Sequence, residues 1–187
     1  MGNSLTRTSS TVIHKQKELD QRLSLHRKQS RAIETDELAN VNWRNTLPFV
    51  PNITKGKVIK VHDGDTITVA SKLRPDDSKS DIYRFNVRIN GIDAPEISSK
   101  DADEKDVAQI AQAELSKLVM NQIVTMDVLC YDKYGRLLAD VYHDDIRLSS
   151  WMLDHHLAVP YDGGTKISPG NWKQYYNAKA SSIDNKP

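Results

Sequence analysis

The sequence predicts an α+β fold: a five-stranded Greek-key barrel of the OB type with about three helices. Between about 57 and 142, apolar and polar side chains alternate in several short segments, as in half-buried strands. The segments 107–120, 148–156 and 171–182 instead have the length and spacing of helices. Periodicity alone predicts only the α+β class, and the five short strands with intervening helices favour the barrel.

The five strands are expected at 58–61, 67–69, 83–89, 123–129 and 137–142. Asp63-Gly64 forms a turn between the first two, and a loop rich in Pro, Ser, Asp and Lys over 72–81 precedes the third. The first helix is expected to begin after Asp101, because Asp101 and Glu104 have the spacing of a capping box.

Composition predicts one domain with an appendage. The chain has 187 residues, of which 38% are apolar and 27% charged, as in ordinary soluble globular proteins. Residues 1–50 are predicted to form a flexible basic tail with one or two marginal helical turns, and residues 51–187 to form the domain. The segment 47–51 is expected to be a linker, because each of its two prolines disfavours helix in the preceding residue.

Charge is distributed unevenly between these parts. Residues 1–50 hold eight Lys and Arg against five Asp and Glu, whereas the remainder holds 18 against 20. The domain is therefore not a globally basic clamp for nucleic acid. Any attraction to a polyanion has to come from local arginines, a bound cation or the tail.

Three short motifs carry the functional information: Asp63-Gly64-Asp65-Thr66, the segment 88–96 (RINGIDAPE), and the segment 132–136 (DKYGR). They supply carboxylates, whose hard oxygens suit calcium or magnesium, and arginines, whose planar guanidinium groups suit phosphate. Such groups are needed to cleave a phosphodiester bond. In this order, over about 55–182, the motifs closely resemble the staphylococcal nuclease (thermonuclease) family.

The resemblance implies the OB-type barrel directly, and it implies a calcium site. Asp65 and Asp93 are the implied metal ligands, together with the backbone carbonyl of Ala94. Many family members have Thr in place of Ala94; a carbonyl ligand survives this change, but a hydroxyl contact is lost. Asp63 is expected next to these ligands, where it would contact them and not the metal itself. The alternative for Asp63 and Asp65 is a structural role as turn-forming carboxylates.

The resemblance also implies roles for four further residues, and Lys133 is a fifth candidate beside them. Glu96 either orients or deprotonates the attacking water. Arg88 and Arg136 bind the charge that develops on the phosphate, and the alternative for both is a surface salt bridge. Tyr134 is expected near the bound nucleotide, where stacking tolerates any base, and Lys133 near a flanking phosphate.

Other residues receive weaker or structural interpretations. Tyr161 lies near a region where the family contributes aromatic side chains, and Arg84 is at most an auxiliary phosphate contact. Cys130 is expected to be a small buried residue in a strand. Surface or packing roles are expected for His62, His143, His155 and His156.

The N-terminal sequence predicts a cytoplasmic, non-secreted protein with a lipid anchor. Met-Gly-Asn-Ser-Leu-Thr has no apolar segment of a secretory signal, and the single cysteine suits a reducing compartment. The same residues match the N-myristoylation pattern, with Gly2 as the acceptor. One acyl chain binds membranes only marginally, so the basic tail is the expected second signal on an anionic membrane surface. Binding of the tail to nucleic acid, or neither role, stays open.

The function predicted from these residues is a metal-dependent, nonspecific nuclease. The resemblance implies activity on DNA and RNA, dependence on Ca²⁺ and products with 3′-phosphate ends, and a monomer is expected. The alternative is a noncatalytic nucleic-acid or protein-binding module of the same family, tethered to a membrane. Such modules usually lack part of the carboxylate and arginine set, whereas this chain keeps all of it.

Overall fold

The computed structural model describes residues 16–28, 38–74 and 79–183, with side chains through 178. The chain divides into two units, Met1–Phe49 and Val50–Pro187. The first unit contains a helix over residues 16–28, which is longer than the one or two turns predicted. Gly2 lies outside the described residues. None of the described helices has the length and apolar character needed to cross a bilayer.

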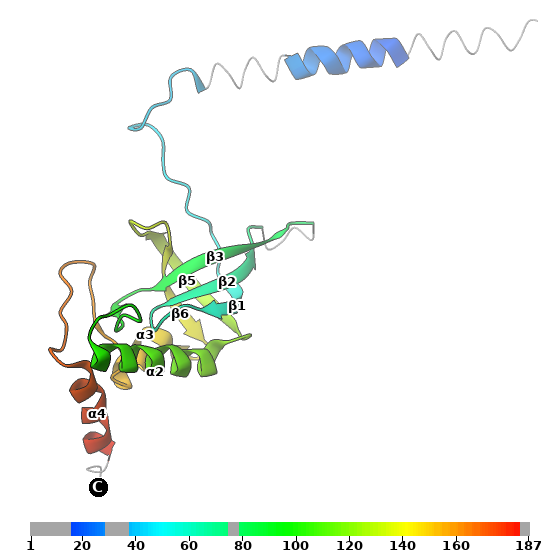
Figure 1. Ribbon diagram of the computed structural model, residues 1–187. Helices are drawn as coiled ribbons and strands as arrows, with labels where there is room; N and C mark the ends of the chain where they lie inside the picture. Colours follow the sequence, from blue (N-terminus) through cyan, green and yellow to red (C-terminus); the bar gives the residue numbers. More distant parts are fainter. Residues whose placement is uncertain (1–15, 29–37, 75–78, 184–187) are drawn as a thin grey trace, which may run out of the picture. The chain divides into compact units, whose positions relative to one another are not determined.

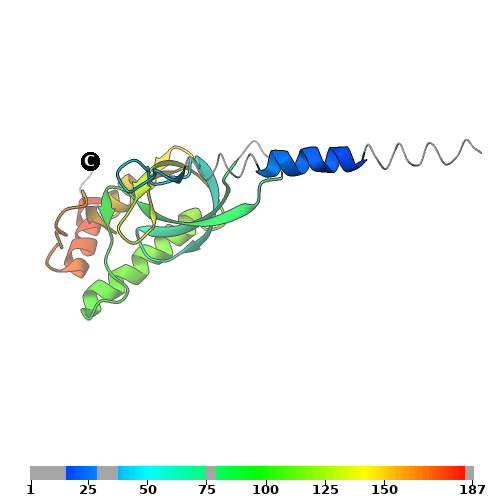
Figure 2. The ribbon, with the colours of Figure 1, turned by 90° about the horizontal axis from the view of Figure 1, so that it is seen from above.

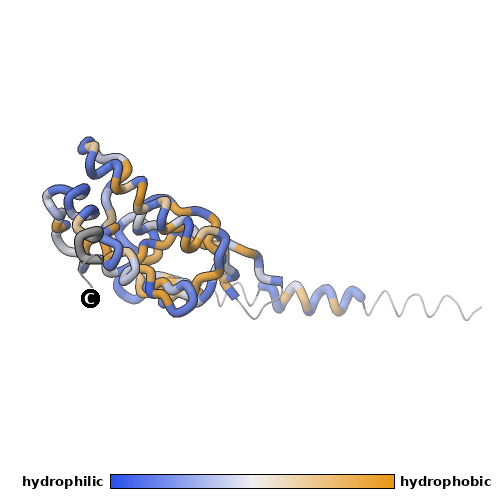
Figure 3. Tube along the Cα trace, turned by 90° about the horizontal axis from the view of Figure 1, so that it is seen from below, coloured by the Kyte–Doolittle hydropathy of each residue, from blue (hydrophilic) through white to orange (hydrophobic). Residues whose placement is uncertain are grey.

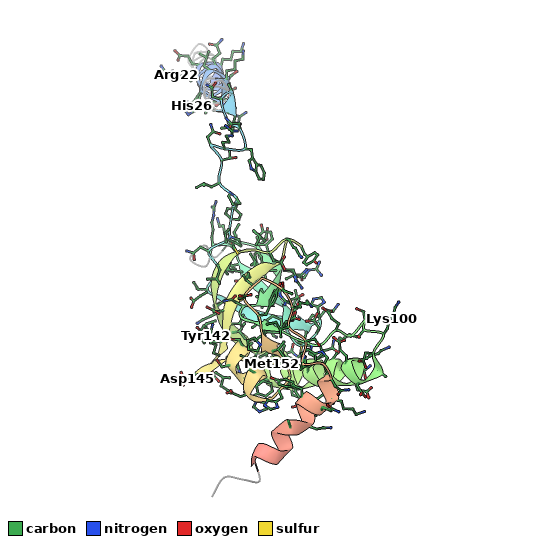
Figure 4. All side chains as sticks on the ribbon, turned by 90° about the vertical axis from the view of Figure 1, so that its left-hand side faces the viewer. Arg22, His26, Lys100, Tyr142, Asp145 and Met152 are labelled. Atoms are coloured by element: carbon green, nitrogen blue, oxygen red, sulfur yellow. The ribbon has the colours of Figure 1, made fainter. Side chains whose placement is uncertain are left out.

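The helix of the first unit mixes apolar and polar residues along its length (Figure 3). Leu19, Leu23 and Leu25 are all exposed. Arg22 and His26 project from the same helix (Figure 4).

The second unit is built on a closed barrel of five strands, which confirms the predicted fold class (Figures 1 and 2). The strands are β1 (Lys55–Val61), β2 (Thr66–Lys72), β3 (Ile82–Ile89), β5 (Ile123–Tyr131) and β6 (Leu137–His143). Their order in the sheet is β3-β2-β1-β5-β6, and β3 pairs with β6 to close it.

The closing pair is parallel, whereas the other neighbours in the barrel are antiparallel. It aligns Val87 with Leu137, Arg88 with Leu138 and Ile89 with Ala139. The end of β3 and the start of β6 therefore lie side by side. This register brings the second and third sequence motifs together at one end of the barrel.

The remaining elements are three helices and three two-residue strands. They are β4 (Ile92–Asp93), α2 (Ala102–Val119), β7 (Ile146–Arg147), α3 (Leu148–Asp154), β8 (Val159–Pro160) and α4 (Trp172–Ile183). The α2 helix begins earlier than its apolar pattern indicates, because Asp101 caps it by accepting the backbone N–H groups of Asp103 and Glu104. β4 pairs with β8, which brings the segment after Val159 next to the second motif.

Apolar side chains of the barrel, α2 and α3 form one core, and Met152 of α3 is fully buried within it (Figure 4). Gly64 packs tightly against this core. A Cβ atom at Gly64 would lie 2.7 Å from the Cβ of Ala94 and 3.0 Å from that of Ala111. Only glycine therefore lets the first motif approach the second so closely.

Cys130 corrects one expectation. It lies in β5 as predicted, but it is exposed rather than buried. The pairing of β5 with β6 shifts register between Val128 and Cys130, which interrupts the alternation of buried and exposed positions.

Candidate active site

The three motifs line one pocket of about 790 Å³, called here the motif pocket. It lies where β3 ends and β6 begins. Among the described residues, its lining includes every residue predicted for the site from sequence except Asp93. Asp93 instead contacts Arg88, which is a lining residue. The predicted site residues in the lining are Asp63, Asp65, Arg88, Ala94, Glu96, Lys133, Tyr134 and Arg136. The four histidines and Arg84 are not among its lining residues.

Arg88 stands at the centre of the site, between the two predicted metal ligands. Its Nη1 lies 2.5 Å from Oδ1 of Asp65, and its Nη2 lies 2.9 Å from Oδ1 of Asp93. Nη2 also donates to the carbonyl oxygen of Ile92 at 3.2 Å. Burial lowers the pKa of the guanidinium, but the charge of Asp65 and hydrogen bonds to both carboxylates outweigh it and raise that pKa. Arg88 thus orders the carboxylates as well as facing the pocket.

Asp65 is almost fully buried and has a fixed orientation. Its Oδ1 accepts the hydroxyl of Thr66 at 2.8 Å, and its Oδ2 accepts the backbone N–H of Ala94 at 3.0 Å. Asp63 accepts the backbone N–H of Asp65 at 3.1 Å, so it supports the predicted ligand from behind. Burial and the adjacent charge of Asp65 raise the pKa of the Asp63 carboxyl to about 6.

This donor set fits a hard divalent cation. Asp65 and Asp93 are buried carboxylates joined through one arginine, and burial, followed by the charge of Asp65, raises the pKa of Asp63 beside them. Within residues 16–28, 38–74 and 79–183, no cluster of three His, Cys, Asp or Glu side chains forms a complete ligand set. A cation bound here would take two side-chain ligands, and its remaining ligands would be backbone oxygen and water, as calcium accepts.

The raised pKa of Asp63 predicts a pH-dependent gain in stability for Asp63→Asn. The folded chain holds the Asp63 proton more tightly than the unfolded chain, so this residue's contribution to stability falls as pH rises from about 4 to above 6. In EDTA, Asp63→Asn should raise the free energy of unfolding at pH 7.5 by on the order of 1 kcal/mol, and by little near pH 4. Urea unfolding at both pH values measures this, and an equal effect at both would contradict it.

Glu96 lies at the exposed rim of the motif pocket, and Glu104 fixes its backbone. The N–H of Glu96 donates to Oε1 of Glu104 at 3.0 Å, and the hydroxyl of Ser99 donates to Oε2 of Glu104 at 2.7 Å. Glu104 was expected to complete a capping box with Asp101. Its carboxylate instead reaches back to Glu96, while Ser99 accepts the N–H of Asp101.

Arg136 enters the pocket from the start of β6. Its Nε lies 2.7 Å from Oδ2 of Asp132, and its Nη1 donates to the hydroxyl of Thr66 at 3.2 Å. Oδ1 of Asp132 accepts the backbone N–H groups of Tyr134 and Arg136, both at 2.9 Å. Asp132 therefore sets the position of Arg136. The Tyr134 ring is highly exposed, and the Arg136 guanidinium carbon lies 5.3 Å from its centroid.

Asp132, Glu104 and Lys166 are site residues that the sequence reasoning missed. Lys166 lies between β8 and α4, and its Nζ is 3.0 Å from Oδ1 of Asp93 and 2.7 Å from Oε1 of Glu96. No motif marks this loop. Tyr161, only loosely indicated by the resemblance, lies in the pocket with its ring centroid 5.7 Å from the guanidinium carbon of Arg88.

Comparison with known proteins identifies the family. Residues 86–185, more than half of the chain, match the family model "Staphylococcal nuclease homologue". "Probable endonuclease LCL3" of Leptosphaeria maculans is 27% identical over 151 residues, which cover 75% of this chain and 49% of the relative. The protein of the same name from Coccidioides posadasii is 29% identical over 148 residues, covering 67% and 47%.

A shorter relative agrees with these matches. An "Uncharacterized endonuclease" of Escherichia coli is 33% identical over 90 residues, which cover 48% of this chain and 49% of that protein. The chain spans about half the length of these curated relatives. The family match covers the second and third motifs, the closing strand pair and all three helices of the barrel unit. The chain therefore belongs to the staphylococcal nuclease homologue family.

Proposed function

We propose that the protein is a calcium-dependent nuclease that hydrolyses DNA and RNA without sequence preference and leaves 3′-phosphate ends. The observation that carries this proposal is the position of Arg88, which joins Asp65 and Asp93 beside the pocket that Glu96 and Arg136 line. The endonuclease names of the relatives support hydrolysis of nucleic acid. The Ca²⁺ requirement and the product ends come from the family resemblance and the hard-oxygen donor set.

Asp65 and Asp93 would hold calcium, which supplies positive charge at the phosphate and lowers the barrier to attack. Glu96 orients a water molecule and takes its proton as the water oxygen bonds to phosphorus. Arg136 donates to the phosphate oxygens on which negative charge develops. The bond from phosphorus to the 5′ oxygen breaks, the 5′ oxygen takes a proton from solvent to become a hydroxyl, and the phosphate stays on the 3′ oxygen.

The side chains that line the motif pocket suit the binding of nucleic acid without sequence preference. Tyr134 is 73% exposed and can stack on any base, because every base has a π-face. Lys133, whose Nζ lies 5.1 Å from the centroid of the Tyr134 ring, adds positive charge beside it. These local groups supply the attraction that the slightly acidic domain lacks.

Arg136→Lys tests the proposal directly. Lysine keeps the charge but loses the planar fork, so cleavage should fall by about 10²- to 10³-fold. The assay follows degradation of single-stranded DNA and of RNA in CaCl₂ and in EDTA, with thermal unfolding as the control for folding. Wild-type protein that degrades neither substrate in calcium would overturn the proposed function and favour the noncatalytic binding module.

A further inference from the structure

Lys166 connects two carboxylates that have different proposed roles. Its ammonium group lies between Asp93, a proposed metal ligand, and Glu96, the proposed water-handling group. The Lys166 side chain is half-exposed, whereas that of Asp93 is almost fully buried. A single, half-exposed positive charge therefore neutralises part of the negative charge of the site from the pocket side.

Two basic groups already occupy Oδ1 of Asp93. A carboxylate oxygen has two lone pairs, and Oδ1 receives Nη2 of Arg88 at 2.9 Å and Nζ of Lys166 at 3.0 Å. A calcium ion binds carboxylate oxygens at about 2.3–2.6 Å. An ammonium group on the same carboxylate would lie close to the cation and repel it. Whether the cation binds Asp93 through Oδ2 or replaces a donor on Oδ1, this repulsion favours the loss of one of the two basic groups from Asp93.

Arg88 is the less able of the two to move. It is largely buried and holds Asp65 and the carbonyl oxygen of Ile92 in addition to Asp93. Lys166 has a flexible four-carbon stem, and the two carboxylates that it contacts, Asp93 and Glu96, both belong to the site. Lys166 can leave Asp93 without breaking contacts elsewhere in the core.

We propose that Lys166 is an exchangeable counter-ion of the metal site, displaced from Asp93 and Glu96 when a divalent cation binds. This inference rests on the proposed function. Displacement also frees Oε1 of Glu96, because the same ammonium group holds both carboxylates. Occupation of the metal site thus releases the carboxylate that handles water. The competition weakens calcium binding relative to a site without the lysine.

Lysine acylation measures the displacement without measuring activity. The full chain is treated briefly with an N-hydroxysuccinimide ester in CaCl₂ or in EDTA, and the lysines are quantified by mass spectrometry. Lys166 should react several-fold faster in calcium. Lys173 is an internal control with the same 51% side-chain exposure, and it pairs with Asp103 and Asp106 outside the motif pocket. Its reactivity should not change.

Calorimetric titration with CaCl₂ supplies the second measurement. Lys166→Met should bind calcium about three- to tenfold more tightly than wild type, whereas Lys173→Met should match wild type. Calcium binding to wild type with unchanged Lys166 reactivity and unchanged affinity in Lys166→Met would overturn the inference and leave the proposed metal site standing. No calcium binding by the wild-type protein would overturn both.

Discussion

Glu96→Gln should slow phosphodiester cleavage by about 10²- to 10⁴-fold while the fold and calcium binding persist. Glutamine has nearly the same shape, but its amide cannot take a proton from water. The backbone of residue 96 keeps its hydrogen bond to Glu104, so the loop keeps its position. Single-turnover rates at saturating CaCl₂ measure the loss.

Glu114→Gln is the matched control for this experiment. Glu114 lies on α2, pairs with Lys117 at 2.6 Å and is not among the residues lining the motif pocket. The same chemical change there should leave the cleavage rate within about twofold of wild type, as for a surface pair. If Glu96→Gln retained the wild-type rate, Glu96 would not handle the attacking water, and its contact with Lys166 would be structural.

Arg88→Met should reduce the free energy of unfolding by about 3–5 kcal/mol in EDTA, because it leaves two buried carboxylates without their shared cation. Asp65 and Asp93 have side-chain exposures of only 6% and 8%. Calcium should restore part of the loss, since a ligand that binds only the folded state stabilises it. Urea unfolding in EDTA and in CaCl₂ measures both effects.

Arg147→Met is the control for Arg88→Met. It shows how much the free energy of unfolding falls when an arginine outside the site is replaced. Arg147 pairs with Asp140 at 2.7 Å near the surface, where ion pairs contribute little. Its replacement should cost no more than about 1 kcal/mol, with no recovery in calcium. An equally small cost for Arg88→Met would show that Arg88 does not organise the two carboxylates.

The sequence predicted most of the barrel because its strands are short, alternating and separated by turn residues. The strand predicted at 83–89 is β3 with one further residue at its start, and the turn at Asp63-Gly64 joins β1 to β2. The motif residues meet because they occupy the ends of neighbouring strands. Arg88 lies near the end of β3, and Arg136 directly precedes β6. The family resemblance grouped the motifs before the structure did, and the pairing of β3 with β6 is what brings them together in space.

The missed contacts depend on the path of the chain in three dimensions. Lys166 lies 70 positions from Glu96, in a loop without periodicity. The pairing of β4 with β8 and the hydrogen bond from the N–H of Tyr161 to the carbonyl oxygen of Gly91 bring the start of that loop to the pocket. In a capping box, the Glu104 carboxylate would accept the backbone N–H of Asp101. The hydroxyl oxygen of Ser99 accepts that N–H instead. The exposure of Cys130 depends on a local shift in strand register, which apolar spacing does not predict.

The parallel pairing of β3 with β6 has a consequence for folding. It joins residues about 50 positions apart, so the chain has to close a long loop before these contacts form. Arg88 lies in the seam, and Arg136 lies beside it. A partly folded chain with an open barrel therefore has both arginine motifs but no shared pocket. Cleavage activity should therefore require barrel closure, and during refolding it should not appear before β3 pairs with β6.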